Sequence, residues 1–324
     1  MHRRQLLLAA GAAPFSSPSQ AATTWRLATG YPEDTFHGRN IAQFAQDVAS
    51  STDGGLRIEL HADNRLVPLA QIPAAVRSGK AQAGEVIMTG LVKEVPIAGA
   101  DSVPFIVADF DDAQRLWQFQ RPLIERHFER LGLRPLFAVP WPPQCLYTIN
   151  PITRASDLRG AKMRTYNATT VRIAELLGAQ AVDVPMSQVD TALAQGRINA
   201  MITSAVTGVE NQVWSAFKYF YEINAFFPKN LTFVNSQAFA DLPSAQQKAV
   251  LDGAGAAEKR GWAASRAAAL ASMAELKRNG LKVEPSPYLL RPDIRRLGER
   301  FSLEWLRDVG PEANEVFIPF FAER

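Results

Sequence analysis

The chain has 324 residues, of which 47% are hydrophobic and 21% are charged, as in an ordinary folded protein. This length is more than one small hydrophobic core needs and therefore predicts two domains or lobes. The formal net charge is only +3, with no long basic run and no alternation of basic and aromatic residues, so we expect no nucleic acid partner.

Residues 1–22 are predicted to be an export signal. Arg3 and Arg4 precede a short apolar run, and the string SQA at 19–21 fits the small-residue rule for cleavage. The arginine pair is compatible with both the general secretory and the twin-arginine route. No later stretch reaches the roughly 20 apolar residues that a membrane helix needs, and a lone Cys145 leaves no internal disulfide. We therefore predict a periplasmic protein held together by its core.

The first part of the mature chain alternates between strand-like and helix-like patterns. Hydrophobic residues alternate in the strand-like segments and recur at helical spacing in the helix-like segments. In chain order, the predicted elements are a strand at 25–30, a helix at 36–51, a strand at 56–62, a helix at 69–78 and a strand at 83–88. Gly79 follows the second helix, at a position where a left-handed residue commonly ends a helix.

The same order of elements returns in the middle of the chain. We predict a strand at 161–165, a helix at 168–177, a strand at 181–185, a helix at 187–195 and a strand at 199–204. Gly178 and Gly196 follow the two helices. The repeated pattern predicts two similar α/β lobes. The alanine-rich segment 243–280 predicts a long helix that braces both of them.

None of the short motifs of common catalytic sites occurs, such as G-x-S-x-G or H-E-x-x-H. The glycine-rich string at 253–258 follows a helix instead of a strand and lacks the third glycine of a dinucleotide fingerprint, so we expect no cofactor. The histidines His2, His37, His61 and His127 are scattered, so we expect no metal site. These features favour a binding protein over an enzyme.

Polar residues stand where two strands of the second half end. Arg164 lies at the end of the strand at 161–165, and Thr203 and Ser204 end the strand at 199–204. Ligands of open parallel sheets bind beyond the carboxyl ends of the strands, so these three side chains are candidate contacts in one cleft. The alternative is an Arg164 that pairs with a carboxylate at the surface.

Five segments, taken together and in this order, resemble the solute-binding proteins of tripartite ATP-independent periplasmic (TRAP) transporters, the dicarboxylate-binding type. They are GGLRIELHADNRLVP (54–68), VKEVPIAGADSVPFI (92–106), NPITRASDLRGAKMRTYN (150–167), GAQAVDVPMSQVDTALAQGRINA (178–200) and LTFVNSQAFADLPSAQQKAVLDGA (231–254). The resemblance covers nearly the whole mature chain. It implies a periplasmic-binding-protein-like fold, with two α/β lobes around a ligand cleft, joined by hinge strands and a long bracing helix.

The resemblance also implies how the lobes are divided and what they do. Residues 23–146 with about 232–275 are expected in the first lobe, and residues 147–231 with about 276–324 in the second. The lobes are expected to close over a carboxylate-bearing solute and deliver it to the permease subunits of a TRAP transporter. The family's ligand arginine maps onto Arg164, whose guanidinium can bind both oxygens of a carboxylate.

Two departures from the family pattern favour an organic monocarboxylate. Thr203 stands where relatives often have an asparagine that touches the ligand, and the segment 141–147 lacks the arginine that many relatives carry there. A second carboxylate on the ligand would therefore have fewer partners. We predict an acid with an apolar or aromatic body, for example a 2-oxo or 2-hydroxy acid. The alternative within this class is a dicarboxylate or a sugar acid.

The remaining candidate ligand contacts are chosen by their position in the predicted lobes. The rings are Trp141, Tyr147, Phe226 and Phe227; the hydrogen-bonding side chains are Gln144, Asn167 and Asn230; and the first lobe offers Glu33, Phe36, His37, Met88 and Thr89. An alternative of another class is a secreted enzyme acting on a small organic acid, for which only His37 and Glu33 supply an acid or a base. The leading prediction has no catalytic residue.

Overall fold

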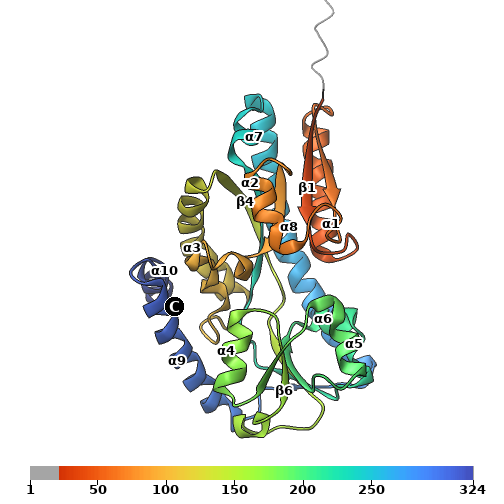
Figure 1. Cartoon of the computed structure of the whole chain (residues 1–324), viewed down its shortest axis with the longest axis vertical. Helices are drawn as coiled ribbons and strands as arrows, with labels where there is room; N and C mark the ends of the chain where they lie inside the picture. The colour runs from red at the N-terminus through yellow and green to blue at the C-terminus, as the bar shows by residue number, and fades with distance from the viewer. Residues whose placement is uncertain (1–21, 324) are drawn as a thin grey trace, which may run out of the picture.

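The computed structural model describes residues 22–323 of the chain. The predicted export signal therefore lies outside the described residues, except for its last position. Within residues 22–323, every helix is too short or too polar to cross a membrane. The described part folds into two lobes, drawn one above the other in Figure 1.

The first lobe is built around a five-stranded sheet with the strand order β2-β1-β3-β10-β4. Strands β2 and β3 both pair with β1 in parallel, as the β-α-β-α-β pattern predicts. Strand β10 returns from the second lobe and runs antiparallel between β3 and β4. The strands are β1 (Thr23–Thr29), β2 (Leu56–His61), β3 (Ala83–Ile87), β4 (Leu133–Pro140) and β10 (Lys229–Asn235).

The second lobe is built around a six-stranded sheet with the strand order β11-β9-β5-β8-β6-β7. Strand β6 pairs in parallel with both β7 and β8, whereas β5 runs antiparallel to β8 and β9. The carboxyl ends of β6 and β8 therefore meet at one edge of the sheet. The strands are β5 (Cys145–Thr148), β6 (Lys162–Thr165), β7 (Gln180–Asp183), β8 (Ala200–Thr203), β9 (Tyr219–Glu222) and β11 (Lys282–Pro285).

Helices pack on both sheets and begin at residues suited to capping. Thr35 accepts a hydrogen bond from the Gly38 amide at the start of α1, and Asn167 accepts one from the Thr170 amide at the start of α4. The helices of the lobes are α1 (Phe36–Ser51), α2 (Ile72–Arg77), α3 (Phe110–Arg130), α4 (Ala168–Leu176), α5 (Val189–Ala194), α6 (Ala205–Glu210) and α7 (Ser236–Ala240).

The long helix α8 (Ser244–Arg278) braces the two lobes, as predicted from its alanine-rich sequence. It contacts α1 and β4 of the first lobe and α6 and β11 of the second. Together with the sheets, this arrangement confirms the predicted two-lobed α/β fold.

The C-terminal segment is divided between the lobes. Strand β11 lies in the second sheet, and α9 (Leu290–Val309) then runs along the side of the molecule toward the first lobe (Figure 1). Helix α10 (Glu312–Ala322) packs against α3, and its Phe317 and Phe320 belong to the core of the first lobe. The sequence prediction assigned 276–324 to the second lobe as one piece, and the aromatic side chains of α10 place its last helix elsewhere.

Candidate ligand-binding site

A cavity of about 360 Å³ lies between the two lobes. This volume is near the lower end of the usual range for small-molecule sites, so it suits a compact ligand. Both lobes and the two crossing segments contribute to its walls. The lining residues are Tyr31, Leu69, Ile87, Trp141, Gln144, Arg164, Tyr166, Asp183, Pro185, Met186, Thr203, Ser204, Thr207 and Pro228.

Arg164 is the cation of this cavity, and strand β6 places it there. Its side chain is 3% exposed, and its Nε donates a hydrogen bond to the Val184 carbonyl at 2.9 Å. The guanidinium carbon lies 4.7 Å from the centre of the Tyr166 ring, which supports it as a cation–π partner. The two terminal nitrogens make no hydrogen bond to any residue in the range 22–323 and are therefore free to bind a ligand.

The charge of Arg164 is not neutralised by a close carboxylate. Within residues 22–323, no Asp or Glu oxygen lies within the ion-pair distance of 4.0 Å, although Asp183 is near enough to act on it electrostatically. Burial lowers the pKa of Arg164 below its ordinary value, and Tyr166 and Asp183 oppose this shift. An arginine stays protonated even so, and a buried cation without a partner is costly. The alternative of an arginine paired at the surface is therefore wrong.

Most other polar groups of the cavity already bind one another. The Gln144 side chain donates to the Pro142 carbonyl at 2.9 Å and accepts from the Tyr166 hydroxyl at 3.0 Å. Ser204 caps helix α6, where its Oγ accepts from the Thr207 amide at 3.2 Å. Besides the guanidinium, the Thr203 hydroxyl and the Asp183 carboxylate are among the few lining groups left for a ligand. The cavity therefore offers strong recognition of one anionic group and a largely apolar surface elsewhere.

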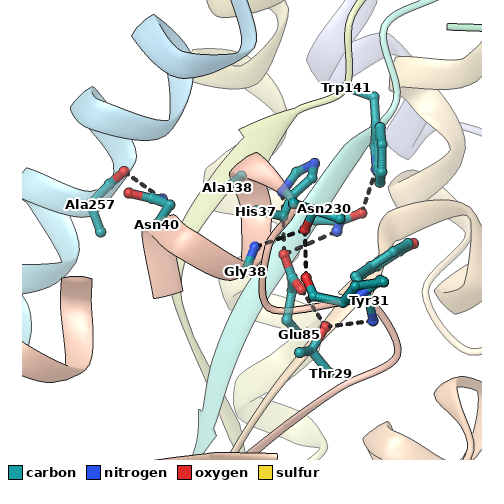
Figure 2. Close-up of polar contacts among 12 residues, drawn as sticks. Thr29, Tyr31, His37, Gly38, Asn40, Glu85, Ala138, Trp141, Asn230 and Ala257 are labelled. Carbon is teal, nitrogen blue, oxygen red and sulfur yellow. Dashed lines mark hydrogen bonds and ion pairs between the residues drawn. The ribbon is translucent and has the colours of Figure 1, made fainter. Parts of the chain in front are cut away.

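The first-lobe wall rests on a buried polar network, shown in Figure 2. The Trp141 indole N–H donates to Asn230 Oδ1 at 2.8 Å, and Asn230 Nδ2 donates to Glu85 Oε1 at 3.0 Å. The Thr29 hydroxyl donates to Glu85 Oε2 at 2.6 Å, and the Trp141 and Tyr31 rings lie 5.3 Å apart. The network fixes the aromatic wall from behind.

The structure brings part of the predicted set to the cavity. Five of the candidates line it: Trp141, Gln144, Arg164, Thr203 and Ser204. Two more, Asn230 and His37, lie behind the wall in or beside the polar network.

The other predicted candidates lie elsewhere for identifiable reasons. Five are packed in hydrophobic cores or form their edges: Phe36, Met88, Tyr147, Phe226 and Phe227. The Asn167 side chain is used to cap α4, and Thr89 belongs to the short 3-10 helix after β3. Glu33 is exposed and lies 3.8 Å from Arg65.

Several residues of the site were not found from the sequence. Tyr31 and Tyr166 both line the cavity and both follow the end of a strand, β1 and β6 respectively. This position is the signal that could have identified them. Glu85 had a weaker signal, as a carboxylate inside the otherwise uncharged strand AGEVI. Leu69, Ile87 and Met186 carry no recognisable signal, because apolar residues line cavities and cores alike.

The cleft widens outward from the cavity into an acidic mouth. A hollow of about 1170 Å³ shares Tyr31 and Met186 with the cavity and carries Asp34, Asp63, Asp190 and Glu210. Burial, with the charge of Asp34 as a further cause, raises the pKa of Glu210 to about 7. This mouth has the wrong sign of charge to hold an anion.

A separate hollow of about 590 Å³ lies on the outside of the second lobe, between α9 and the end of α4. Its arginines, Arg154, Arg159, Arg296 and Arg300, are exposed to solvent. Two of them pair with acidic residues of α9, Arg296 with Asp293 and Arg300 with a glutamate. Exposed, paired arginines bind weakly, so the interlobe cavity is the better candidate site despite its smaller volume.

Comparison with known proteins agrees with this geometry. Residues 27–293 match the family described as "Bacterial extracellular solute-binding protein, family 7". The crystal structure of DctP7, a Bordetella pertussis extracytoplasmic solute receptor binding pyroglutamic acid, is 34% identical with a TM-score of 0.89 over 92% of this chain and 99% of that one.

Two further structures have the same fold. A TRAP solute-binding protein from a marine metagenome, in complex with co-purified pyroglutamate, is 28% identical, with a TM-score of 0.88 over 93% of this chain and 99% of that one. A TRAP solute-binding protein from Chromohalobacter salexigens with bound D-glucuronate is 19% identical, with a TM-score of 0.83 over 90% and 97%. Proteins of this kind are extracytoplasmic, bind small organic acids and work with membrane permeases. The chain belongs to family 7 of the bacterial extracellular solute-binding proteins, the solute-binding component of TRAP transporters.

Proposed function

We propose that this protein binds a compact organic monocarboxylate in the interlobe cavity and delivers it to a TRAP permease. The observation that carries the proposal is Arg164, a buried guanidinium with both terminal nitrogens free among the described residues. A carboxylate matches that pair of nitrogens with two parallel hydrogen bonds. One such cation suits one carboxylate.

The rest of the cavity supports a ligand body with few polar groups. Tyr31, Ile87, Trp141, Met186 and Pro228 supply apolar or aromatic surface. Because Gln144, Tyr166 and Ser204 already bind other groups, extra hydroxyls on a ligand would find few partners and would lose water. Pyroglutamate, a five-membered lactam with one carboxylate, fits these requirements, and three of the similar structures bind it. The alternative is a sugar acid, whose hydroxyls would have to share the few free groups of this cavity.

The ligand is proposed to act by shifting the lobes toward a closed form. The cavity walls come from both lobes, so a ligand makes its full set of contacts only when the lobes are close together. A ligand that binds one conformation better increases its population. Residues 1–22 are proposed to direct export by either route, which places this event in the periplasm.

We propose no chemical reaction at this site. The two groups considered as an acid or a base do not line the cavity: Glu33 is exposed to solvent, and His37 lies behind the Trp141 ring. Incubation of the protein with its ligand, followed by mass spectrometry, should recover the ligand unchanged. A product formed at a rate proportional to protein concentration would support the enzyme alternative.

A thermal-shift screen of organic acids tests the proposed ligand class. A ligand that binds only the folded protein raises its melting temperature. The panel contains pyroglutamate, 2-oxo and 2-hydroxy monocarboxylates, C4 and C5 dicarboxylates, and hexuronates. Compact monocarboxylates should give the largest shifts, and calorimetry should then give their dissociation constants. Shifts confined to dicarboxylates or hexuronates, or no shift with any acid, would contradict the proposal.

A further inference from the structure

A buried carboxylate, Glu85, lies behind the first-lobe wall of the cavity, on the side away from the second-lobe Arg164. We propose that Glu85 is a charge filter that restricts the site to ligands with a single negative charge. Ile87, two positions further along β3, lines the cavity together with Tyr31 and Trp141, whereas Glu85 does not. Figure 2 shows Glu85 beside these two rings. The inference rests on the proposed function and names the ligand class of the same site.

The hydrogen bonds of Glu85 fit an ionised carboxylate. Both oxygens accept from donors, Oε2 from the Thr29 hydroxyl at 2.6 Å and Oε1 from the Asn230 amide at 3.0 Å. An ionised carboxylate only accepts, and a short hydrogen bond from a hydroxyl is typical of a charged acceptor. The side chain is 2% exposed, so water screens its charge poorly.

No permanent cation neutralises Glu85. Among residues 22–323, no lysine or arginine nitrogen lies within 4.0 Å of its carboxylate. His37 Nδ1 lies 3.3 Å from Oε1, within ion-pair distance but without the geometry of a hydrogen bond. Its Nε2 is buried and has no hydrogen-bond partner among the described residues, and the His37 ring packs against the Trp141 and Phe36 rings.

The other charges near the cavity do not neutralise Glu85. The acidic mouth, with Asp34, Asp63, Asp190 and Glu210, adds further negative charge, which stays unchanged in a Glu85 variant. Asp183 lines the cavity on the same side as Arg164 and is exposed to solvent, which screens it. The buried Lys229 at the start of β10 pairs with the buried Asp101, with Nζ 3.3 Å from Oδ2. The negative charge of Glu85 also acts on the cavity wall. The pKa of Tyr31 is raised mainly by burial and, as the second cause, by the charge of Glu85.

The consequence is a cavity with opposite charges at its two sides. A ligand whose carboxylate binds Arg164 points its other end toward the Glu85 side. A neutral group at that end is not repelled, whereas a second carboxylate is repelled through a medium that screens charge poorly. We expect a dicarboxylate to bind at least about tenfold more weakly than its monoamide of the same shape, which corresponds to about 1.4 kcal/mol.

The test compares two probes that differ only at this end, glutarate and its monoamide glutaramate, with pyroglutamate as a reference. Calorimetry measures the dissociation constant of glutarate divided by that of glutaramate, in the parent protein and in two variants. Glu85→Gln removes the charge and keeps the shape, so the ratio should fall at least about fivefold. The matched control Glu33→Gln makes the same change at an exposed first-lobe carboxylate away from the cavity, and the ratio should stay within about twofold.

The outcomes separate the two proposals. If the parent binds pyroglutamate but also binds glutarate and glutaramate equally, the charge filter is wrong and the ligand class stands. If none of the three binds, both proposals are wrong. If circular dichroism shows that Glu85→Gln does not fold, the parent protein alone tests the filter. The ratio of the two dissociation constants is then measured between about 0.05 and 0.5 M salt, a range over which the Debye length shortens by about threefold. A buried charge keeps the ratio nearly constant, and a ratio that falls to one contradicts the filter.

Discussion

Arg164→Lys separates charge from geometry at the proposed anion site. Lysine keeps one positive charge on a flexible stem, but it has a single nitrogen and no planar fork. In the parent, the Nε hydrogen bond to the Val184 carbonyl at 2.9 Å and the Tyr166 ring fix the plane of the guanidinium. Both terminal nitrogens are thereby held ready for the two oxygens of one carboxylate.

The expected loss follows from this geometry. The substitution removes one of two charge-assisted hydrogen bonds, each worth about 1.5–3 kcal/mol. This corresponds to binding weakened by about 10- to 150-fold. Arg164→Ala removes both hydrogen bonds and the charge, so its loss should be at least as large. Neither change deletes an ion pair within residues 22–323, so the loss should appear in ligand binding.

Isothermal titration calorimetry with the best acid of the thermal-shift screen measures these losses. The control is Arg159→Lys, the same substitution at an exposed arginine of the second lobe, which should bind within about twofold of the parent. Urea unfolding of each variant shows whether the fold is intact. The reasoning is refuted if Arg164→Lys is folded and binds within about threefold of the parent, because the fork would then contribute nothing to recognition.

Three further changes test other parts of the structure. Because the pKa of Glu210 is raised to about 7, the acidic mouth loses negative charge as pH falls from 8 to 6. The association rate constant of the anionic ligand, measured by stopped flow, should therefore rise by about two- to fivefold over this range. Glu210→Gln should abolish this pH dependence. Gly208→Ala drives a methyl group into the Tyr147 hydroxyl and should lower the free energy of unfolding by about 1–3 kcal/mol, unlike Gly255→Ala, which meets no atom within 4 Å. Lys229→Met leaves the buried Asp101 without its ion-pair partner. It should lower the free energy of unfolding, measured with urea, by about 3–5 kcal/mol.

The secondary structure of this chain was largely predictable from local patterns. The helix predicted at 36–51 has those bounds in α1, and the long helix predicted at 243–280 is α8 at 244–278. Apolar spacing and helix-ending glycines depend on neighbours along the chain, so one sequence contains them. The order of strands in a sheet, in contrast, does not depend on neighbours along the chain. The antiparallel insertion of β10 between β3 and β4 depends on pairing between distant segments.

The candidate site was predicted where its residues had a positional signal. Arg164, Thr203 and Ser204 stand where strands end, and the structure places all three in the cavity wall. The aromatic candidates had no such signal. Phe226 and Phe227 follow β9 on a crossing segment and are buried in two different cores. Composition reports that a ring is apolar, but not which surface it faces.

The sequence by itself determined the alternation of strands and helices, the two-lobed class and an arginine at the rim of a sheet. Only the tertiary structure decided that this arginine is buried without a carboxylate partner in the described part of the chain, and that Glu85 lies behind the wall of the other lobe. The reason is physical. Local patterns record which face of an element is apolar, whereas the charge balance of a cavity depends on distances between residues far apart in the chain. Arg164 and Glu85 belong to separate sheets, and no local pattern relates them.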